Sequence, residues 1–228
     1  MSSTSIASEP WRRPQHSPRD ASPEAPLGDL RFRALLSDRD WAALPPAVQR
    51  RFSSRLAAGE TIVYAGRVVE TRMSRVGWCL AQAARAIGAP LALGRDRNVA
   101  AVVAVTEEMA GGGQVWTRVY ARRGGFPQVI HSAKRFAGRT GLEEQVGGGV
   151  GMALTVHVVD AALVFRSAGY FVRVLGRRIA LPTWLAPGAL VVTHAALGDG
   201  SFTFTLDLRH PRFGALIRQT AVFREAIS

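Results

Sequence analysis

The stretch from Glu143 to Val159 constrains the fold more than any other part of the chain, because apolar residues recur along it at almost every second position. A period of two is typical of a β-strand, and at about 3.3 Å per residue one strand would span about 50 Å here. Glycines are positions where a strand can bend or accept a close neighbour. We therefore expect one long strand with an apolar face and, at Gly147, Gly149 and Gly151, a bare opposite face.

A bare face of this kind must be covered, either by a slim helix of the same chain or by a bound ligand. Residues 74–88 predict such a helix, because Ser74 can cap its start and Gly88 can end it. Small side chains, including Ala83 and Ala84, occupy much of its length. The sequence leaves both the helix and the ligand open as the cover of the glycines.

Most of the chain after Asn98 alternates in the same way, with glycine-rich turns between the alternating segments. Strands and helices do not alternate, which argues against a parallel sheet. We expect an α+β fold that is mainly antiparallel, either a strongly curved sheet or a half-open β-barrel, with two or three helices packed against it. One of those helices should open at Pro45 and Pro46 and end at Gly59.

Composition divides the chain into two regions. Residues 1–29 are rich in Pro, Ser and Arg and are predicted to be a disordered tail, because they can bury little apolar surface. Residues 30–228 are predicted to form a single β-rich domain.

The N-terminus lacks the apolar stretch of a signal peptide, and the apolar region 146–165 alternates and contains His157 and Asp160. We therefore expect no transmembrane segment and a cytoplasmic location.

The formal net charge of +12 raises the question of nucleic-acid binding. The basic residues are almost all arginines, spread as singles and pairs without a run of five, so we interpret them as a solvated surface and expect no specific nucleic-acid partner.

No helix opens after the glycines at 147–149, which argues against a phosphate-binding loop. Cys79 is the only cysteine, and the histidines lack zinc-site spacing, so no metal and no cofactor are expected.

Polar residues concentrate between Gln128 and Glu144. On a strand, His131 and Ser132 point to opposite faces, so they cannot form a nucleophile pair within their own strand. Catalytic residues stay unknown, and ordinary cross-strand ion pairing is the alternative interpretation. The candidate ligand-binding residues are Trp116, Arg118, Tyr120, His131, Lys134, Glu144, Gly147, Gly149 and Gly151.

Several motifs occur in order, among them W-T-R-V-Y at 116–120, F-P-Q-V-I-H-S-A-K-R-F-A-G at 126–138 and T-L-D-L-R-H-P-R-F-G at 205–214. Through these motifs the chain resembles a bacterial family known as domain of unknown function 4166, over roughly residues 40–225. The resemblance implies a bacterial protein whose relatives sometimes follow a reductase-type module, and hence an association with a reductase-type protein. The family has no established activity, so no catalytic residue is carried over.

Three functions follow from these observations. We favour a binding module for a hydrophobic or lipid-like small molecule, because the strands are apolar on one side and the glycines leave space. The alternative is an enzyme or reductase-accessory domain that uses His131 with Glu144 or Lys134. The second alternative is an interaction protein that uses its basic surface. We expect a non-enzymatic role.

Overall fold

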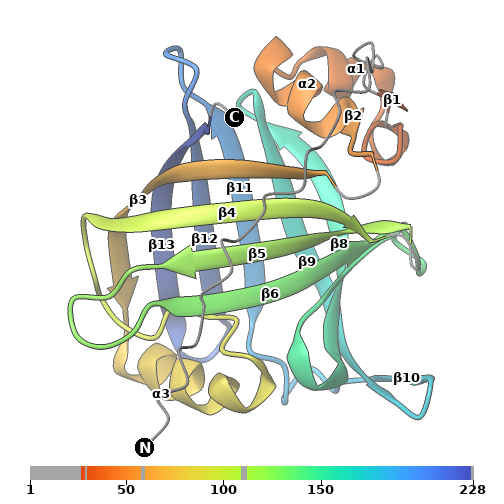
Figure 1. Ribbon diagram of the computed structural model, residues 1–228. Helices are drawn as coiled ribbons and strands as arrows, with labels where there is room; N and C mark the ends of the chain where they lie inside the picture. The colour runs from red at the N-terminus through yellow and green to blue at the C-terminus, as the bar shows by residue number, and fades with distance from the viewer. Residues whose placement is uncertain (1–26, 29, 58–59, 109–111, 227–228) are drawn as a thin grey trace, which may run out of the picture.

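The computed structural model describes residues 27–28, 30–57, 60–108 and 112–226 (Figure 1). Its helical segments are η1 (Arg33–Leu35), α1 (Asp38–Ala42), α2 (Pro46–Ser53), α3 (Arg75–Ala83), η2 (Ala84–Ile87) and η3 (Gly147–Gly149). Its strands are β1 (Leu27–Gly28), β2 (Ser54–Arg55), β3 (Thr61–Met73), β4 (Val99–Glu108), β5 (Gly113–Tyr120), β6 (Gln128–Arg135), β7 (Leu142–Gln145), β8 (Val150–Val159), β9 (Ala162–Val174), β10 (Arg177–Ala180), β11 (Ala189–Ala196), β12 (Phe202–His210) and β13 (Gly214–Glu225).

Strands β3 to β9 and β11 to β13 form a closed antiparallel β-barrel of 10 strands. Their order is β9-β11-β12-β13-β3-β4-β5-β6-β7-β8, and the pairing of β8 with β9 closes the ring. Strand β10 pairs with β9 and projects from the barrel as a hairpin (Figure 1). The predicted antiparallel architecture is confirmed, and the sheet closes completely. Closure pairs the edges that an open sheet would expose.

Helices lie at both ends of the barrel (Figure 1). At one end α1 packs on β8 and α2 on β11, and at the other end α3 packs on β13. The predicted helix over 74–88 is confirmed: the Ser74 side chain accepts a hydrogen bond of 3.0 Å from the Gly77 backbone N–H, and Gly88 ends η2 with φ +92. A Cβ at Gly77 would lie 2.1 Å from the Leu216 carbonyl oxygen, so glycine lets α3 approach β13 closely.

The helix predicted from Pro46 to Gly59 begins as expected but ends at Ser53. The backbone becomes extended at Ser54, and the short strand β2 that follows pairs with β1 at residues 27–28. Gly59 lies outside the described residues, as do residues 1–26 and 29 of the predicted tail. The predicted helix therefore holds only as far as Ser53.

The prediction of one long strand from Glu143 to Val159 is wrong. The stretch is a hairpin in which β7 and β8 pair antiparallel, with Leu142 opposite Leu154, and the glycines form its turn. Gly148 and Gly149 have φ of +66 and +73, in the left-handed region that glycine adopts without steric cost. The glycines therefore reverse the chain, and no ribbon of about 50 Å exists to make the sheet wrap inward.

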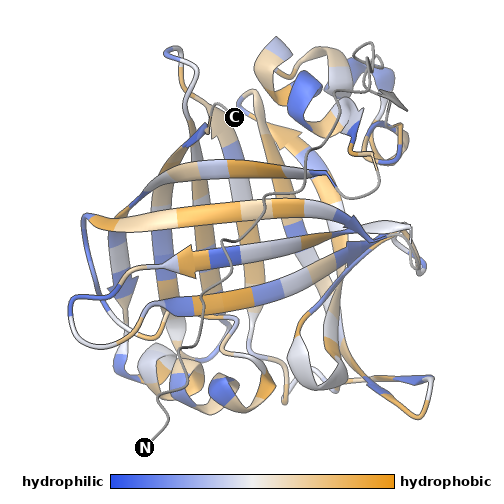
Figure 2. Ribbon diagram, viewed as in Figure 1, coloured by the Kyte–Doolittle hydropathy of each residue, from blue (hydrophilic) through white to orange (hydrophobic). Residues whose placement is uncertain are grey.

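Apolar side chains recur along the barrel strands (Figure 2) and meet in the interior. The end covered by α1 and α2 is filled by aromatic residues: the ring of Phe32 lies 5.1 Å from that of Phe52 and 4.9 Å from that of Phe136, both edge-on. Trp41 and Val48 are buried in the same cluster. The end covered by α3 and η2 contains a cavity.

Candidate functional site

A cavity of about 390 Å³ lies at the end of the barrel that α3 and η2 cover. Its walls are mostly apolar and come from both helices, from β8 and β9, from the segment that follows β10, and from β11 and β12. Leu80 and Ile87 form the helical side, and Met152 and Val192 belong to the strand side. A volume of this size is within the usual range for small-molecule sites, about 300–1,000 Å³.

Small residues shape one side of this cavity. Ala83 and Ala84 line it, so the helix that covers this end takes up little of the space. Gly151 also lines it, and a Cβ at Gly151 would lie 2.5 Å from the Phe171 ring. The helical interpretation holds at the hairpin turn, where the end of η2 packs on Gly147 and Gly148, whereas a ligand over the glycines stays a prediction.

The turn glycines contact the end of η2. A Cβ at Gly147 would lie 2.6 Å from the carbonyl oxygen of Ile87, and one at Gly148 would lie 3.1 Å from its side chain. Gly149 packs instead on the backbone of Arg173 in β9. Of the three glycines in the candidate site, Gly147 and Gly149 are exposed turn residues, and Gly151 lines the cavity.

A buried cluster of charged side chains lies at the inner wall of the barrel. Lys134 and Glu144 occupy paired positions on β6 and β7, and Lys134 Nζ lies 3.1 Å from Glu144 Oε2. Arg118 on β5 donates through Nη2 to Ser132 Oγ at 2.6 Å and to Glu144 Oε1 at 3.4 Å. Arg118 and Glu144 both line the cavity, so this cluster gives an apolar space one polar region.

In this cluster, two basic side chains surround one carboxylate. Lys134 and Glu144 are 5% and 6% exposed. Burial opposes ionisation of Glu144, but Lys134, Arg118 and Ser132 outweigh it and lower the pKa of that carboxyl to about 2. Burial and the nearby Arg118 lower the pKa of Lys134, whereas Glu144 raises it. We conclude that Glu144 is ionised at neutral pH.

Aromatic rings complete the inner wall. Lys134 Nζ lies 4.8 Å from the centre of the Trp116 ring and 5.6 Å from that of Phe165, distances at which a cation is attracted to the ring face. Trp116, Arg118 and Tyr120 point inward from β5 at alternate positions, as the strand period predicts. All three border a second internal space of about 20 Å³, close to the size of one water molecule.

Sequence reasoning missed a second polar pair, the half-buried Arg51 and the buried His194, which also borders this small space. Arg51 Nη1 lies 2.8 Å from His194 Nε2, and His194 is 1% exposed. Because a guanidinium has only donors, His194 Nε2 accepts and its proton lies on Nδ1. Burial, together with Arg51, lowers the pKa of His194 to about 3. The two residues meet only because α2 packs on β11, and no local pattern indicates this contact.

His131 does not join the cluster. It is exposed on the outer face of β6, where its Nδ1 lies 3.1 Å from the Thr117 hydroxyl. Ser132 and Lys134 point inward, so the predicted separation of His131 from Ser132 holds. The candidate residues therefore divide in two: Trp116, Arg118, Tyr120, Lys134, Glu144 and Gly151 surround the interior, while His131, Gly147 and Gly149 lie outside it.

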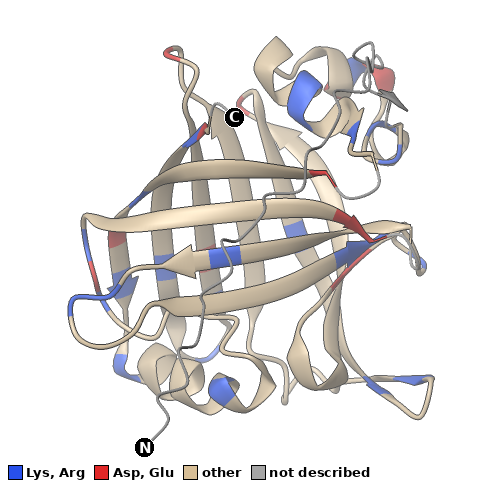
Figure 3. Cartoon of the chain, in the orientation of Figure 1, with Lys and Arg blue, Asp and Glu red and all other residues tan. Residues whose placement is uncertain are grey.

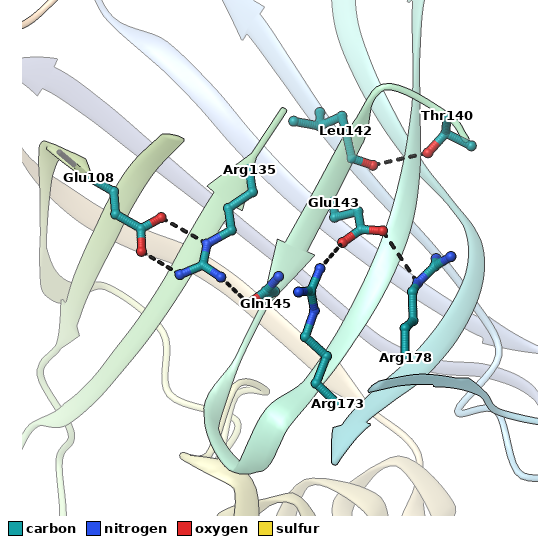
Figure 4. Close-up of polar contacts among 8 residues, drawn as sticks. All are labelled: Glu108, Arg135, Thr140, Leu142, Glu143, Gln145, Arg173 and Arg178. Carbon is teal, nitrogen blue, oxygen red and sulfur yellow. Dashed lines mark hydrogen bonds and ion pairs between the residues drawn. The ribbon is translucent and has the colours of Figure 1, made fainter. Parts of the chain in front are cut away.

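Ion pairs on the other face of β7 hold the wall of the site in place (Figure 4). Glu143 is buried there and pairs with Arg173 of β9 at 3.0 Å and with Arg178 of β10 at 3.3 Å. Arg135 of β6 binds Glu108 through two nitrogens and donates to Gln145 Oε1 at 3.0 Å. Arg135 thus ties β6 to β4 and β7, and Glu143 ties β7 to the β9–β10 hairpin close to its turn.

The part of the chain that the structure describes contains no group of three or more His, Cys, Asp and Glu side chains that could hold a metal ion. None of its helices is long and apolar enough to cross a bilayer.

Comparison with protein families identifies the domain. Residues 44–223 match the model of the family described as Domain of unknown function (DUF4166). The chain belongs to this family. The match covers all of α2, the barrel from β3 to β12 and most of β13, so the DUF4166 domain here is the closed barrel. No curated protein and no solved structure matches the chain.

Proposed function

We propose that this DUF4166 domain binds a hydrophobic, lipid-like small molecule in the cavity beneath α3 and η2. The observation that carries the proposal is an apolar space of about 390 Å³ with one charged region, at Arg118 and Glu144. Such a combination is typical of ligand sites, where apolar walls supply affinity and a few polar groups fix orientation.

The charge of the inner wall favours a ligand with an acidic end. The cluster contains two basic side chains, Arg118 and Lys134, and only one acidic side chain, Glu144. The Nε of Arg118 is buried and finds no hydrogen-bond partner among the residues that the structure describes. Because an unpaired buried donor is costly, a carboxylate or another anionic group that reaches Arg118 would supply both a partner and a counter-charge. A fatty acid is the simplest molecule of this kind.

The geometry favours binding over the enzymatic alternative. His131 lies on the outer face, away from Glu144 and Lys134. Glu144, with its pKa of about 2, is a weak base and holds no proton at neutral pH. A general acid or base works best when its pKa lies near the operating pH. The cluster is therefore better suited to holding a charge than to transferring a proton.

Mass spectrometry of small molecules that co-purify with the native protein tests the proposal directly. We expect an acidic lipid or a similar amphiphile to be released on denaturation. A second assay uses the binding of an anionic fluorescent amphiphile, 1-anilinonaphthalene-8-sulfonate, by the folded protein. The Ala84→Phe variant should fill part of the cavity and weaken binding, because Ala84 lines it.

The control is Ala86→Phe, which changes an exposed residue of the same η2 segment that does not line the cavity. This variant should bind the fluorophore as the parent protein does. Equal binding by all three proteins, with no co-purified molecule, would show that the cavity is not a ligand site.

A further inference from the structure

The β9–β10 hairpin extends beyond the barrel and carries an exposed apolar tip. Leu175 at the turn is 98% exposed, and Val174 and Ile179 beside it are also exposed. In the segment that follows β10, Trp184 is 76% exposed and Leu185 is exposed as well. Single exposed apolar residues are common, but several exposed apolar residues within the short stretch 174–185 indicate an interaction surface.

The backbone at the tip supports this interpretation. Leu175 has φ +49 and Gly176 has φ +77. Two-residue hairpin turns with both φ values positive favour Asn or Asp followed by Gly, and a leucine in the left-handed region costs about 1–2 kcal/mol. Leu175 is almost fully exposed, so its contacts with the described residues do little to offset this cost. Its side chain is better explained by a contact outside the protein.

The hairpin is basic as well as apolar (Figure 3). Residues 161–198 contain no Asp or Glu, whereas the hairpin carries Arg173, Arg177 and Arg178. Arg173 and Arg178 flank the carboxylate of Glu143. Arg177 has no ion pair within the described residues and is exposed beside the turn. The local net charge of this group is therefore +2, from three arginines and one glutamate.

The exposed surface is continuous with the wall of the cavity. Leu185 is both exposed and part of that wall, and Val172 of β9 and Leu181 after β10 line the same space. The Leu181 backbone N–H donates to the Tyr170 carbonyl oxygen at 2.8 Å, which fixes this segment to β9. Whatever the hairpin contacts would thus lie beside the cavity of the proposed function.

We propose that the β9–β10 hairpin and the segment around Trp184 dock on the surface of an anionic phospholipid bilayer. Aliphatic residues would enter the interfacial region, Trp184 would lie at the headgroup level, and the arginines would contact lipid phosphates. A second copy of the chain fits this surface less well, because two chains of net charge +12 repel one another. The inference goes beyond ligand binding and does not require it.

Vesicle flotation tests the proposal with the full chain. The protein should float with vesicles that contain phosphatidylglycerol, should bind vesicles of pure phosphatidylcholine more weakly, and should dissociate as salt is added. Arg177→Gln should lower the partition coefficient about fivefold, since a basic residue near an anionic surface contributes about 1 kcal/mol. Leu175→Asn and Trp184→Ser should each lower it about tenfold or more, in proportion to the apolar area removed.

The tip variant tests binding without disturbing the fold. Asparagine adopts positive φ more readily than leucine, so Leu175→Asn should melt at the same temperature as the parent protein or higher. The matched control is Phe126→Ser in the turn between β5 and β6, because Phe126 is also exposed and follows the arginine pair at 122–123. Under the proposal this control floats like the parent protein.

Three results would overturn the inference: no flotation with either vesicle, the same loss for Phe126→Ser as for Leu175→Asn, or concentration-dependent self-association that Leu175→Asn abolishes in the absence of vesicles. Binding of 1-anilinonaphthalene-8-sulfonate by Leu175→Asn separates the two proposals. The variant keeps the cavity and should keep fluorophore binding while it loses vesicle binding.

Discussion

Glu144 accepts hydrogen bonds from Lys134 and Arg118 through different carboxylate oxygens, so one buried anion holds two buried cations. Removing the anion leaves Lys134 and Arg118 without a counter-charge in the barrel, and breaking a buried pair in this way typically costs about 3–5 kcal/mol. We expect Glu144→Gln to lower the free energy of unfolding by about this amount. Lys134→Met should cost less, because Glu144 keeps Arg118 as a partner.

Urea denaturation of the parent protein and both variants measures these differences. The decisive result is which of the two variants loses more unfolding free energy. If Lys134→Met were the more damaging change, packing of the lysine stem against Trp116 would outweigh the charge balance of the cluster.

Because His194 is buried, we expect the protein to lose folding stability in acid. The pKa of His194 is about 3 in the fold and 6.5 in the unfolded chain, so between these values the unfolded state binds a proton that the folded state does not. Stability therefore falls as pH drops below about 6.5, by up to about 1.4 kcal/mol per pH unit from this group alone. Glu144 adds a second loss as pH falls from 4.5 towards about 2, because its folded pKa is depressed.

The His194→Gln variant isolates the first contribution. Glutamine offers Arg51 an acceptor but does not titrate, so the unfolding free energy of this variant should change less than that of the parent protein between pH 6.5 and 4.5. Guanidinium denaturation curves at several pH values give the two slopes. Parallel slopes would show that His194 binds a proton in the fold as readily as in the unfolded chain, and would contradict the prediction.

The glycine turn predicts unequal effects of alanine substitution. At Gly149 a Cβ would lie 2.5 Å from the Arg173 carbonyl oxygen, whereas at Gly148 the nearest atom is a methyl carbon of Ile87 at 3.1 Å. Both positions have positive φ, so each alanine should cost about 1–2 kcal/mol in backbone strain, and Gly149→Ala should cost more because of the added clash.

Thermal unfolding of the two alanine variants and of Gly148→Asn measures this difference. Asparagine tolerates the left-handed region, so Gly148→Asn should be more stable than Gly148→Ala. Were residues 143–159 one continuous strand, the asparagine variant would show no such advantage.

Alternation of apolar residues predicts the antiparallel strands but cannot show this hairpin. In the pairing of β7 with β8, Leu142 lies opposite Leu154 and Glu144 opposite Met152, so even-numbered residues face inward on both sides of the turn. The period of two therefore runs through the reversal without a break. Only the positive φ of Gly148 and Gly149 marks the turn, and backbone angles cannot be read from a sequence.

Local chemistry predicts other parts of the site well. The capping serine and terminal glycine of 74–88 follow from nearest neighbours, and the common face of Trp116, Arg118 and Tyr120 follows from the strand period. Contacts between distant segments cannot be predicted in this way. Closure of the barrel by β8 and β9, and the meeting of Arg51 with His194, depend on how whole elements pack, and neither leaves a pattern within a short stretch.

Arg118 predicts the selectivity of the proposed ligand site. A medium-chain fatty acid and the alcohol of the same length would place the same apolar chain in the cavity, but only the acid presents an anion to the guanidinium. Because a hydrogen bond to a charged group contributes about 1.5–3 kcal/mol, the parent protein should bind the acid at least about tenfold more tightly than the alcohol. Arg118→Met should remove most of this difference and leave binding of the alcohol nearly unchanged.

Isothermal titration calorimetry of the two ligands gives both affinities for each protein. The substitution leaves Lys134 paired with Glu144, so the variant should remain folded, and Arg123→Met, an exposed arginine outside the cavity, serves as the control. Loss of both ligands by Arg118→Met would indicate that Arg118 shapes the cavity rather than recognising charge. Unchanged binding of both would place the acidic end elsewhere, because no other cationic side chain among the described residues lines this cavity.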